Sequence, residues 1–300
     1  KSNLEELGFF RTTDIQFKTI TAILNGEDVL AIAQTGSGKT AAFAIPIINQ
    51  IHVQKTTKHS YGLKCLVLVP TRELAKQIGQ VFAKLSKNTK ASTYAIYGGV
   101  EQDPQIKQLA GGIDIIVATP GRMFDLIHQQ HIDVSTGQTL VLDEADHMLD
   151  LGFIEDIESI KRKLRQRHQT LFFSATINPK IKKLAYSQVR SNALRIQVSP
   201  EKLVSRNVTH YITKVAMDDK RHLLLNFCLA NPEAKTIVFV RTQVRADRVL
   251  AHLTRNAILA VNIHGGMLQA EREKSLESFR EQVSGLMIAT DVSARGIDLP

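Results

Sequence analysis

The sequence predicts an α/β protein in which two doubly wound parallel-sheet domains follow one another, the second truncated at its C-terminal end. Short apolar runs alternate with helical stretches along the 300 residues, which are 43% hydrophobic but only 6% aromatic. Apolar strands separated by helices are typical of parallel sheets covered on both faces. Layers of Val, Ile, Leu and Ala account for the low aromatic content, and this length suffices for about two domains.

The first part of the chain has the clearer pattern. A short helix, a turn at residues 7–10 and a second helix from about Thr13 are expected first, and Thr12 or Thr13 can cap the second helix. In a doubly wound sheet, ligands lie at the carboxyl ends of the strands, and a polar cluster follows each apolar run here. The expected strands are residues 29–32, 66–69, 93–97, 113–117, 139–142 and 170–173.

The pattern weakens after Lys183, and residues 197–205 have the Pro and polar content of an interdomain connection. Because a second unit of this size is small for a doubly wound domain, and the chain lacks an initiator methionine, we expect a piece of a longer protein. Further strands are expected at 209–215, 236–240, 260–263 and 285–289. The expected division is an N-terminal segment 1–21, a first domain 22–200, a linker 201–207 and a second domain 208–300.

Composition limits the classes of protein to consider. The formal net charge is +9 and the pI is about 9.5, which suits a polyanionic partner but also fits a basic surface with no specific ligand. Cys65 and Cys228 are too far apart in sequence for a disulfide framework or a CxxC metal site, so a reducing cytoplasm is the simplest setting. No apolar run of about 18 residues and no signal peptide is present, so no membrane association is expected.

Residues 33–40, Ala-Gln-Thr-Gly-Ser-Gly-Lys-Thr, stand between an apolar run and a helical stretch. A strand, a turn of small residues and a helix form a phosphate-binding loop, in which backbone N–H groups face the anion. Lys39 would reach the β- and γ-phosphates, and the Thr40 hydroxyl would bind Mg²⁺. A tight strand–helix connection is the alternative, but Gly-Lys-Thr in this position strongly favours nucleotide binding.

Asp143 and Glu144 directly follow the expected strand 139–142. In a phosphate-loop enzyme this is the place of a second metal carboxylate, so Asp143 would hold Mg²⁺ and Glu144 would orient or deprotonate the attacking water. Two acids after a strand also suit a helix N-cap; combined with the phosphate loop, the catalytic interpretation is favoured. Gln16 offers an amide that could contact an adenine edge, although a lone Gln is more often solvated.

The four residues 143–146 spell Asp-Glu-Ala-Asp, and with them the sequence resembles the DEAD-box ATP-dependent RNA helicases of superfamily 2, with a compact core of the bacterial type. The resemblance spans nearly the whole chain, and its motifs occur in order. Residues 8–9 with 15–16 resemble the Q motif, 33–40 motif I, 70–75 motif Ia, 98–99 the GG element, 119–122 motif Ib, 174–176 motif III, 238–240 motif IV, Gln269 and Arg272 the QxxR element, and 289–298 motif V.

The resemblance implies two RecA-like domains that close on ATP, Mg²⁺ and single-stranded RNA. It implies that Ser174 and Thr176 couple Asp143 and Asp146 to this closure. The implied nucleotide contacts are Gln16, Thr35, Gly36, Ser37, Gly38, Lys39, Thr40 and, at the ribose, Asp298. The implied RNA contacts, mostly to phosphates and sugars, are Thr71, Arg72, Gly99, Thr119, Gly121, Arg122, Gln269, Arg272 and Thr290.

Two departures from the family pattern qualify these expectations. Thr12 and Asp14 stand where the Q motif usually carries Pro, and the arginine-bearing motif VI would follow Pro300. These 300 residues alone are therefore expected to bind ATP but to hydrolyse it poorly. The expected function is an RNA helicase that separates short duplexes and releases RNA after ATP hydrolysis, with unspecified protein partners. The alternatives are a nonenzymatic ATP-gated RNA clamp or scaffold and, third, a DNA helicase.

Overall fold

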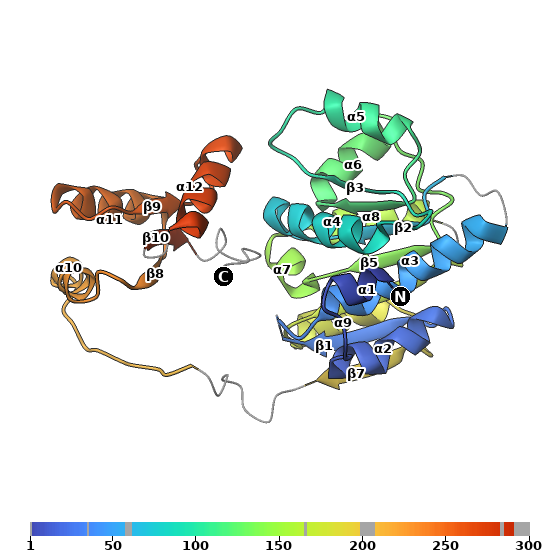
Figure 1. Cartoon of the computed structure of the whole chain (residues 1–300), viewed down its shortest axis with the longest axis horizontal. Helices are drawn as coiled ribbons and strands as arrows, with labels where there is room; N and C mark the ends of the chain where they lie inside the picture. The colour runs from blue at the N-terminus through green and yellow to red at the C-terminus, as the bar shows by residue number, and fades with distance from the viewer. Residues whose placement is uncertain are drawn as a thin grey trace. The chain divides into compact units, whose positions relative to one another are not determined.

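The computed structural model describes residues 2–34, 36–57, 62–164, 167–198, 208–282 and 285–290. The chain divides into two compact units, residues 1–206 and 207–300, each with helices packed on a sheet (Figure 1). All strand pairs in both sheets are parallel. The predicted α/β class is therefore confirmed. The predicted linker 201–207 lies outside the described residues, so its boundaries stay a prediction.

The first unit contains a seven-stranded sheet in the order β3-β4-β2-β5-β6-β1-β7. Strand β1 precedes the phosphate loop, β5 precedes Asp143 and β6 ends at Ser174, and these three strands are adjacent in the sheet. Its elements are α1 (Ser2–Glu6), α2 (Asp14–Leu24), β1 (Val29–Ala33), α3 (Lys39–Thr57), β2 (Cys65–Leu68), α4 (Arg72–Ser86), β3 (Thr93–Ile96), α5 (Asp103–Ala110), β4 (Ile115–Ala118), α6 (Pro120–His128), β5 (Thr139–Leu142), α7 (Ala145–Asp150), α8 (Ile154–Lys163), β6 (Gln169–Ser174), α9 (Pro179–Gln188) and β7 (Leu194–Val198).

The strands of this sheet bury both faces, because alternate side chains point to opposite sides. In β1, Val29 and Ala31 pack in a core with α2, α3 and α4, whereas Leu30 and Ile32 pack in a second core with α6 to α9. Phe43 of α3 lies with its ring centroid 5.2 Å from that of Phe173 in the first core. The continuous apolar runs expected as strands reflect this two-sided burial.

The predicted strands of the first unit agree with the observed ones to within about two residues, the usual uncertainty of element ends. One strand was missed, namely β7 at the sheet edge. Its residues Gln197 and Val198, expected at the start of the connection, pair with Ile32 and Ala33 of β1. The strand carries polar side chains on its exposed side, so its sequence lacks the continuous apolar run of the central strands.

Local capping bonds set several helix starts in the first unit. The Leu74 backbone N–H donates to the Thr71 hydroxyl at the start of α4, at 3.2 Å, and the Ile181 N–H donates to the Asn178 side chain at the start of α9, at 2.9 Å. Such caps satisfy backbone donors that have no partner within the helix.

Among the described residues, no helix is both long and apolar enough to cross a membrane.

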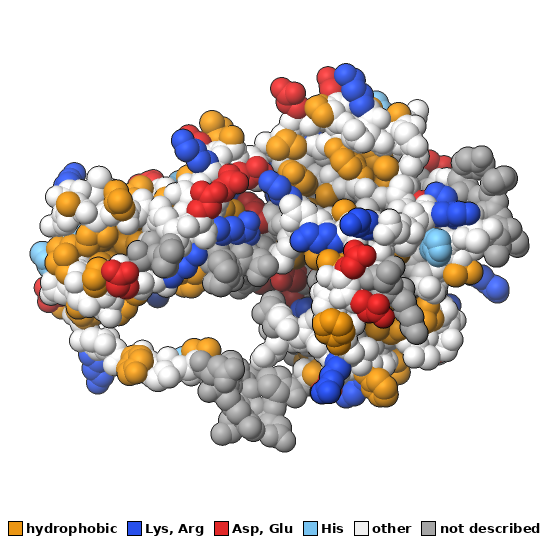
Figure 2. Space-filling model, in the orientation of Figure 1, with side chains coloured by type: hydrophobic (Ala, Val, Ile, Leu, Met, Phe, Trp, Pro, Cys, Tyr) orange, Lys and Arg blue, Asp and Glu red, His pale blue; other side chains and the backbone are white. Residues whose placement is uncertain are grey.

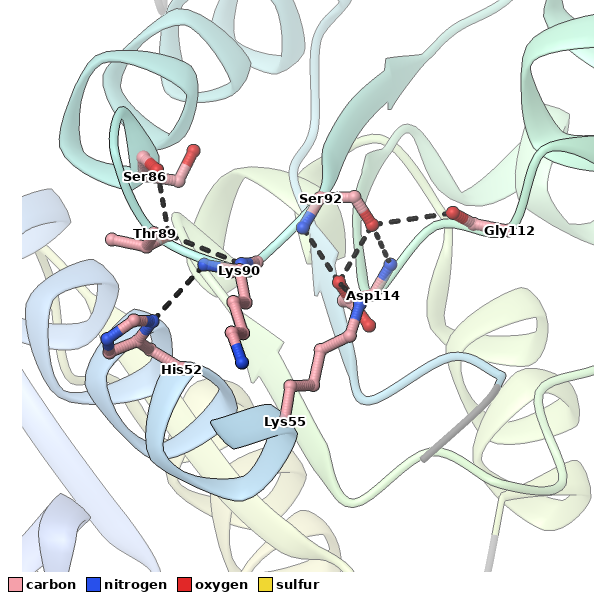
Figure 3. A network of polar contacts seen from close by, with 9 residues as sticks. His52, Lys55, Ser86, Thr89, Lys90, Ser92, Gly112 and Asp114 are labelled. Atoms are coloured by element: carbon pink, nitrogen blue, oxygen red, sulfur yellow. Dashed lines mark hydrogen bonds and ion pairs between the residues drawn. The ribbon is translucent and has the colours of Figure 1, made fainter. Parts of the chain in front are cut away.

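A polar network fixes the amino edge of the same sheet (Figure 3). The buried Asp114 carboxylate, just before β4, forms an ion pair with Lys55 of α3 at 2.9 Å and accepts hydrogen bonds from the Ser92 N–H and hydroxyl, each at 2.7 Å. Nearby, the Lys90 N–H donates to the His52 ring at 3.2 Å. These contacts tie the end of α3 to the starts of β3 and β4, at the edge opposite the phosphate loop.

The second unit has a three-stranded sheet in the order β8-β10-β9, with two small cores on its faces. Hydrophobic side chains remain exposed on this unit, as the orange patches at the left of Figure 2 show. Its elements are α10 (Lys220–Ala230), β8 (Lys235–Val240), α11 (Gln243–Arg255), β9 (Val261–Ile263), α12 (Gln269–Glu281) and β10 (Gly285–Thr290).

The predicted strand at residues 209–215 is wrong. This stretch forms no strand, and its Tyr211 and Ile212 side chains are 88% and 95% exposed. A strand requires a hydrogen-bonded neighbour, and no strand in the described part of the chain pairs with this stretch. The other predicted strands of this unit correspond to β8, β9 and β10.

Candidate active site

The predicted phosphate loop lies between β1, which ends at Ala33, and α3, which begins at Lys39. Gly36 and Gly38 have φ angles of +78° and +91°, a left-handed backbone that favours glycine. Lys39 is buried, and its Nζ donates to the Ala33 carbonyl at 2.9 Å, so the side chain folds back across the loop. A glycine turn at a helix start directs backbone N–H groups toward an anion. Thr35 lies outside the described residues.

The start of α2 packs against this loop. The Thr13 hydroxyl donates to the Ser37 carbonyl at 2.8 Å, and Gln16 Nε2 donates to the Gly38 carbonyl at 3.2 Å. Gln16 Oε1 in turn accepts from the Thr13 N–H at 3.0 Å. One N–H and one lone pair of the amide therefore remain for a ligand. The sequence indicated Thr13 only as a helix cap, because its contact with the loop joins segments that are distant along the chain.

Asp143 follows β5 and is 3% exposed, and it accepts a hydrogen bond from the Glu144 N–H at 3.0 Å. Burial raises the pKa of Asp143 to about 6; Lys39 opposes this effect, and Glu144 and Asp146 add to it. Lys39 and Asp143 are thus near neighbours, since only β6 separates β1 from β5 in the sheet. Thr40, the second residue of α3, is partly buried.

Glu144 has a left-handed backbone, with φ 52° and ψ 47°. This conformation is uncommon for a residue other than glycine, and strained residues often cluster at functional sites. Glu144 precedes α7, yet its side chain makes no capping hydrogen bond, which counts against the N-cap alternative. His147 Nδ1 lies 3.6 Å from Glu144 Oε2, and within the described residues neither ring nitrogen of this buried histidine has a hydrogen-bond partner. His147 was not predicted from the sequence.

The segment after β6 is joined to α7. The backbone N–H and the hydroxyl of Thr176 both donate to Asp146 Oδ2, at 3.0 Å and 2.8 Å. The Ser174 hydroxyl, in a fully buried residue, donates to the Thr176 carbonyl at 2.8 Å. The structure therefore links residues 174–176 to Asp146, and within the described residues no hydrogen bond joins Ser174 or Thr176 to Asp143.

Strands β2, β3 and β4 are neighbours in the sheet, and the segments that follow them carry six of the residues for which RNA contacts were predicted, namely Thr71, Arg72, Gly99, Thr119, Gly121 and Arg122. Arg72, directly after the capping Thr71, lies so close to Gly99 that a Cβ at Gly99 would overlap its guanidinium. Arg122 Nη2 donates to the Val100 carbonyl at 3.0 Å, while its buried Nη1 has no hydrogen-bond partner among the described residues. Burial lowers the pKa of Arg122, and Arg72 lowers it further, whereas Asp125 opposes them.

Thr119 and Gly121 both precede Arg122 at the start of α6. Thr119 lies immediately before the helix, and a Cβ built at Gly121 would meet no described residue within 4 Å apart from its chain neighbours and its own helix backbone. The carboxyl edge of the sheet thus has two halves. We call the ends of β1, β5 and β6 the nucleotide half, and the ends of β2, β3 and β4, with Arg72 and Arg122, the basic half.

In the second unit, Gln269 is the first residue of α12, and its Nε2 donates to Glu273 at 3.2 Å. Arg272 Nη1 donates to the His264 carbonyl at 3.4 Å. Thr290 is buried at the end of β10. Asp298 and the remainder of the predicted motif V lie outside the described residues, so their positions stay predictions.

Comparison with known families agrees with this geometry. The family model described as "DEAD/DEAH box helicase" matches residues 13–184, and that described as "Helicase conserved C-terminal domain" matches residues 219–300. The chain is 36% identical to the DEAD-box ATP-dependent RNA helicase RhpA of Helicobacter pylori and 37% identical to CshA of Bacillus cereus, over 98% and 99% of its length. It covers 58% and 55% of these relatives, a little over half of their length.

Two solved structures cover 100% of the chain. One, titled a hypothetical ATP-dependent RNA helicase from Sulfolobus tokodaii, has 33% identity, a TM-score of 0.59 and 84% of its own length covered. The other, Saccharomyces cerevisiae Dbp5 bound to RNA and ADP BeF3, has 28% identity, a TM-score of 0.88 and 75% covered. The matched family models together extend over most of the chain, and the chain therefore belongs to the DEAD-box family of RNA helicases.

Proposed function

We propose that the protein is an ATP-dependent RNA helicase that binds ATP with Mg²⁺ and single-stranded RNA, unwinds short duplexes and releases RNA after hydrolysis. One observation carries the proposal. A single edge of the first sheet brings the phosphate loop and Asp143 together in its nucleotide half and places Arg72 and Arg122 in its basic half. The relatives named as RNA helicases, and the Dbp5 structure that contains RNA and a nucleotide, support this assignment.

The nucleotide half fits a nucleotide with its metal. The glycine turn leaves the loop backbone open to phosphates, and Lys39 already lies beside Asp143. Thr40 and Asp143 would hold Mg²⁺, which when bound neutralises charge on the phosphates. Lys39 would contact the β- and γ-phosphates, and Glu144 would accept the proton of the attacking water. The Gln16 N–H and lone pair that have no partner among the described residues would contact adenine.

The hydrogen bonds between Thr176 and Asp146 connect the nucleotide half to residues 174–176. Asp146 lies two residues after Glu144, so a displacement of Asp143 or Glu144 can also move Thr176. Ser174 would move with it, because its hydroxyl donates to the Thr176 carbonyl. We assign Ser174 and Thr176 this coupling role. Asp298 is assigned to the nucleotide ribose by family resemblance alone.

The basic half fits the sugar-phosphate backbone of RNA. Arg122 Nη1 is a buried donor that has no hydrogen-bond acceptor among the described residues, and a phosphate oxygen would be a suitable acceptor. Contacts of this kind predict weak sequence preference and a strong dependence of affinity on salt. The remaining assigned contacts are Thr71, Gly99, Thr119 and Gly121 in the first unit, and Gln269, Arg272 and Thr290 in the second.

The test uses the full-length protein. RNA should stimulate its ATPase activity more than DNA of the same sequence, and a short RNA duplex should be unwound through many turnovers. Glu144→Gln should retain ATP binding but lower turnover by about 10²- to 10⁴-fold. Glu155→Gln, on the exposed start of α8, removes the same charge and should leave turnover unchanged.

Two outcomes would contradict the proposal. RNA-dependent ATP binding without multiple-turnover unwinding would favour the ATP-gated clamp, and equal stimulation by DNA and RNA would favour a DNA helicase. Near-normal turnover in Glu144→Gln would remove Glu144 from the role of base.

A further inference from the structure

A buried histidine joins several segments of the second unit. His264 follows β9 and is 7% exposed. Its ring Nε2 lies 3.0 Å from Asp247 Oδ1 on α11, and its Nδ1 accepts a hydrogen bond from the Gly266 N–H at 3.2 Å. Its backbone carbonyl accepts from Arg272 Nη1 of α12 at 3.4 Å. The residue thus contacts α11, its own loop and α12.

The hydrogen bonds determine which ring nitrogen carries the proton. A backbone N–H can only donate, so the Nδ1 that faces Gly266 must be unprotonated. The proton of the neutral ring is then on Nε2, where it is donated to the Asp247 carboxylate. Asn262 Nδ2 also lies 3.3 Å from Nε2, but with this tautomer both are donors, and Asn262 Nδ2 donates instead to the same carboxylate oxygen at 2.8 Å. Asp247 therefore selects the tautomer that accepts the loop hydrogen bond.

The loop that His264 holds has little room to rearrange. A Cβ at Gly266 would lie 2.6 Å from Gln243 Oε1, so the amide at the start of α11 covers the loop closely. Two residues later α12 begins, and the Leu268 N–H donates to Glu271 Oε2 at 3.1 Å. The loop conformation accordingly sets where the first turn of α12 begins.

We infer that Asp247 is a positioning residue for RNA binding: through the His264 ring it fixes the loop 264–268 and thereby the placement of Gln269 and Arg272. Asp247 itself touches no RNA in this proposal, and its side chain is 59% exposed. The inference rests on the proposed function, which assigns Gln269 and Arg272 to RNA. The inference adds that this RNA contact depends on Asp247 and on the His264 tautomer with its proton on Nε2.

Substitution of Asp247 in the full-length protein tests this inference, with RNA affinity measured by fluorescence anisotropy over a series of salt concentrations. Asp247→Ala removes the acceptor and should weaken RNA binding about three- to tenfold, the equivalent of one hydrogen bond. The slope of log Kd against log salt should fall by about one phosphate contact. Asp247→Asn keeps an acceptor oxygen and should restore affinity to within about twofold of the parent protein.

Electrostatics alone predicts the opposite sign, because removing a carboxylate near a phosphate contact tightens RNA binding. Asp219→Ala is the matched control. Asp219 is the exposed N-cap residue of α10, but its side chain makes no capping hydrogen bond, so this variant removes the same charge and should not weaken binding. Affinity of Asp247→Ala equal to or tighter than that of the parent protein would overturn the inference.

Arg272→Ala separates failure of the inference from failure of the proposed function. If Arg272→Ala weakens binding and Asp247→Ala does not, RNA contact by α12 stands and the positioning role is wrong. If Arg272→Ala binds as the parent does, the RNA assignment of α12 fails, and the inference with it. Nitrogen-15 shifts of the His264 ring in the unaltered protein give a test that needs no variant. A proton on Nε2 is expected, and one on Nδ1 would overturn the inference.

Discussion

Replacing Asp143 by Asn should stabilise the nucleotide-free protein, because the ionised carboxylate is costly at this buried position. Burial raises its pKa from 3.8 to about 6 even though Lys39 favours the charged form. At about 1.36 kcal/mol for each unit of pKa, the ionised group destabilises the fold by about 3 kcal/mol at neutral pH. Asn resembles the protonated acid and can still accept from the Glu144 N–H, but its amide N–H groups need partners. We therefore expect a gain of about 1–2 kcal/mol.

The pH dependence distinguishes this explanation from a general packing effect. Below about pH 4 the carboxyl is protonated in both the folded and the unfolded protein, so Asp143→Asn should have no advantage. Between about pH 4 and 6 the folded protein binds more protons, so the stability of the parent falls as pH rises and the advantage of the variant grows. Above about pH 7 the stability advantage of Asp143→Asn should be constant.

Thermal unfolding with EDTA and without nucleotide measures this difference. At about 2–4 °C per kcal/mol for a unit of this size, the midpoint should rise by about 2–8 °C at pH 8. Stability equal to or below that of the parent at pH 8, or a difference that does not change with pH, would refute the argument.

Three further changes test other parts of the first unit. Arg190→Ala should destabilise it by about 1–2 kcal/mol, because the buried Asp28 carboxylate loses its guanidinium partner. Urea unfolding measures this loss of stability, which should vanish as pH falls through the titration of Asp28, whose pKa is held below its ordinary value. Gly79→Ala should also destabilise by about 1–3 kcal/mol despite its better helix propensity, because the new Cβ would lie 2.7 Å from that of Ala95. Gln16→Ala should reduce the preference for ATP over GTP in binding assays, and an unchanged preference would exclude Gln16 from base recognition.

The central strands were predictable because their burial is encoded locally. The run 139–142 coincides with β5, and its side chains are all buried, so neither face required a polar residue. The rule that ligands lie at the carboxyl ends of parallel strands then predicted that Lys39 and Asp143 would meet, although they are far apart in sequence. The charge of Lys39 lowers the pKa of Asp143, which agrees with that prediction.

Features that depend on a neighbour could not be predicted in this way. The edge strand β7 exists because β1 offers hydrogen bonds, while its exposed Arg195 and Gln197 interrupt the apolar run. Residues 209–215 have strand-like composition but no pairing strand among the described residues. The left-handed backbone of Glu144 has no sequence signature, because it follows from how β5 passes into α7.

The two edges of the first sheet treat acidic residues in opposite ways. At the amino edge, burial alone would raise the pKa of Asp28, but hydrogen bonds from Arg190 and the Thr170 N–H hold it below its ordinary value. At the carboxyl edge, Asp143 is as deeply buried, and Lys39 compensates it only in part. The first acid stabilises the fold, whereas the second weakens it.

The carboxyl edge has two groups without full compensation, and their charges are of opposite sign. In the nucleotide half, Lys39 only partly offsets the rise in the pKa of Asp143, and in the basic half the buried Arg122 Nη1 has no acceptor within the part of the chain that the structure describes. A protein selected for stability alone would pair such groups, as this one does at its amino edge. Unsatisfied groups of this kind concentrate where ligands complete the structure. A cation delivered to the first half and phosphates delivered to the second would satisfy both, as the proposed function requires of ATP with Mg²⁺ and of RNA.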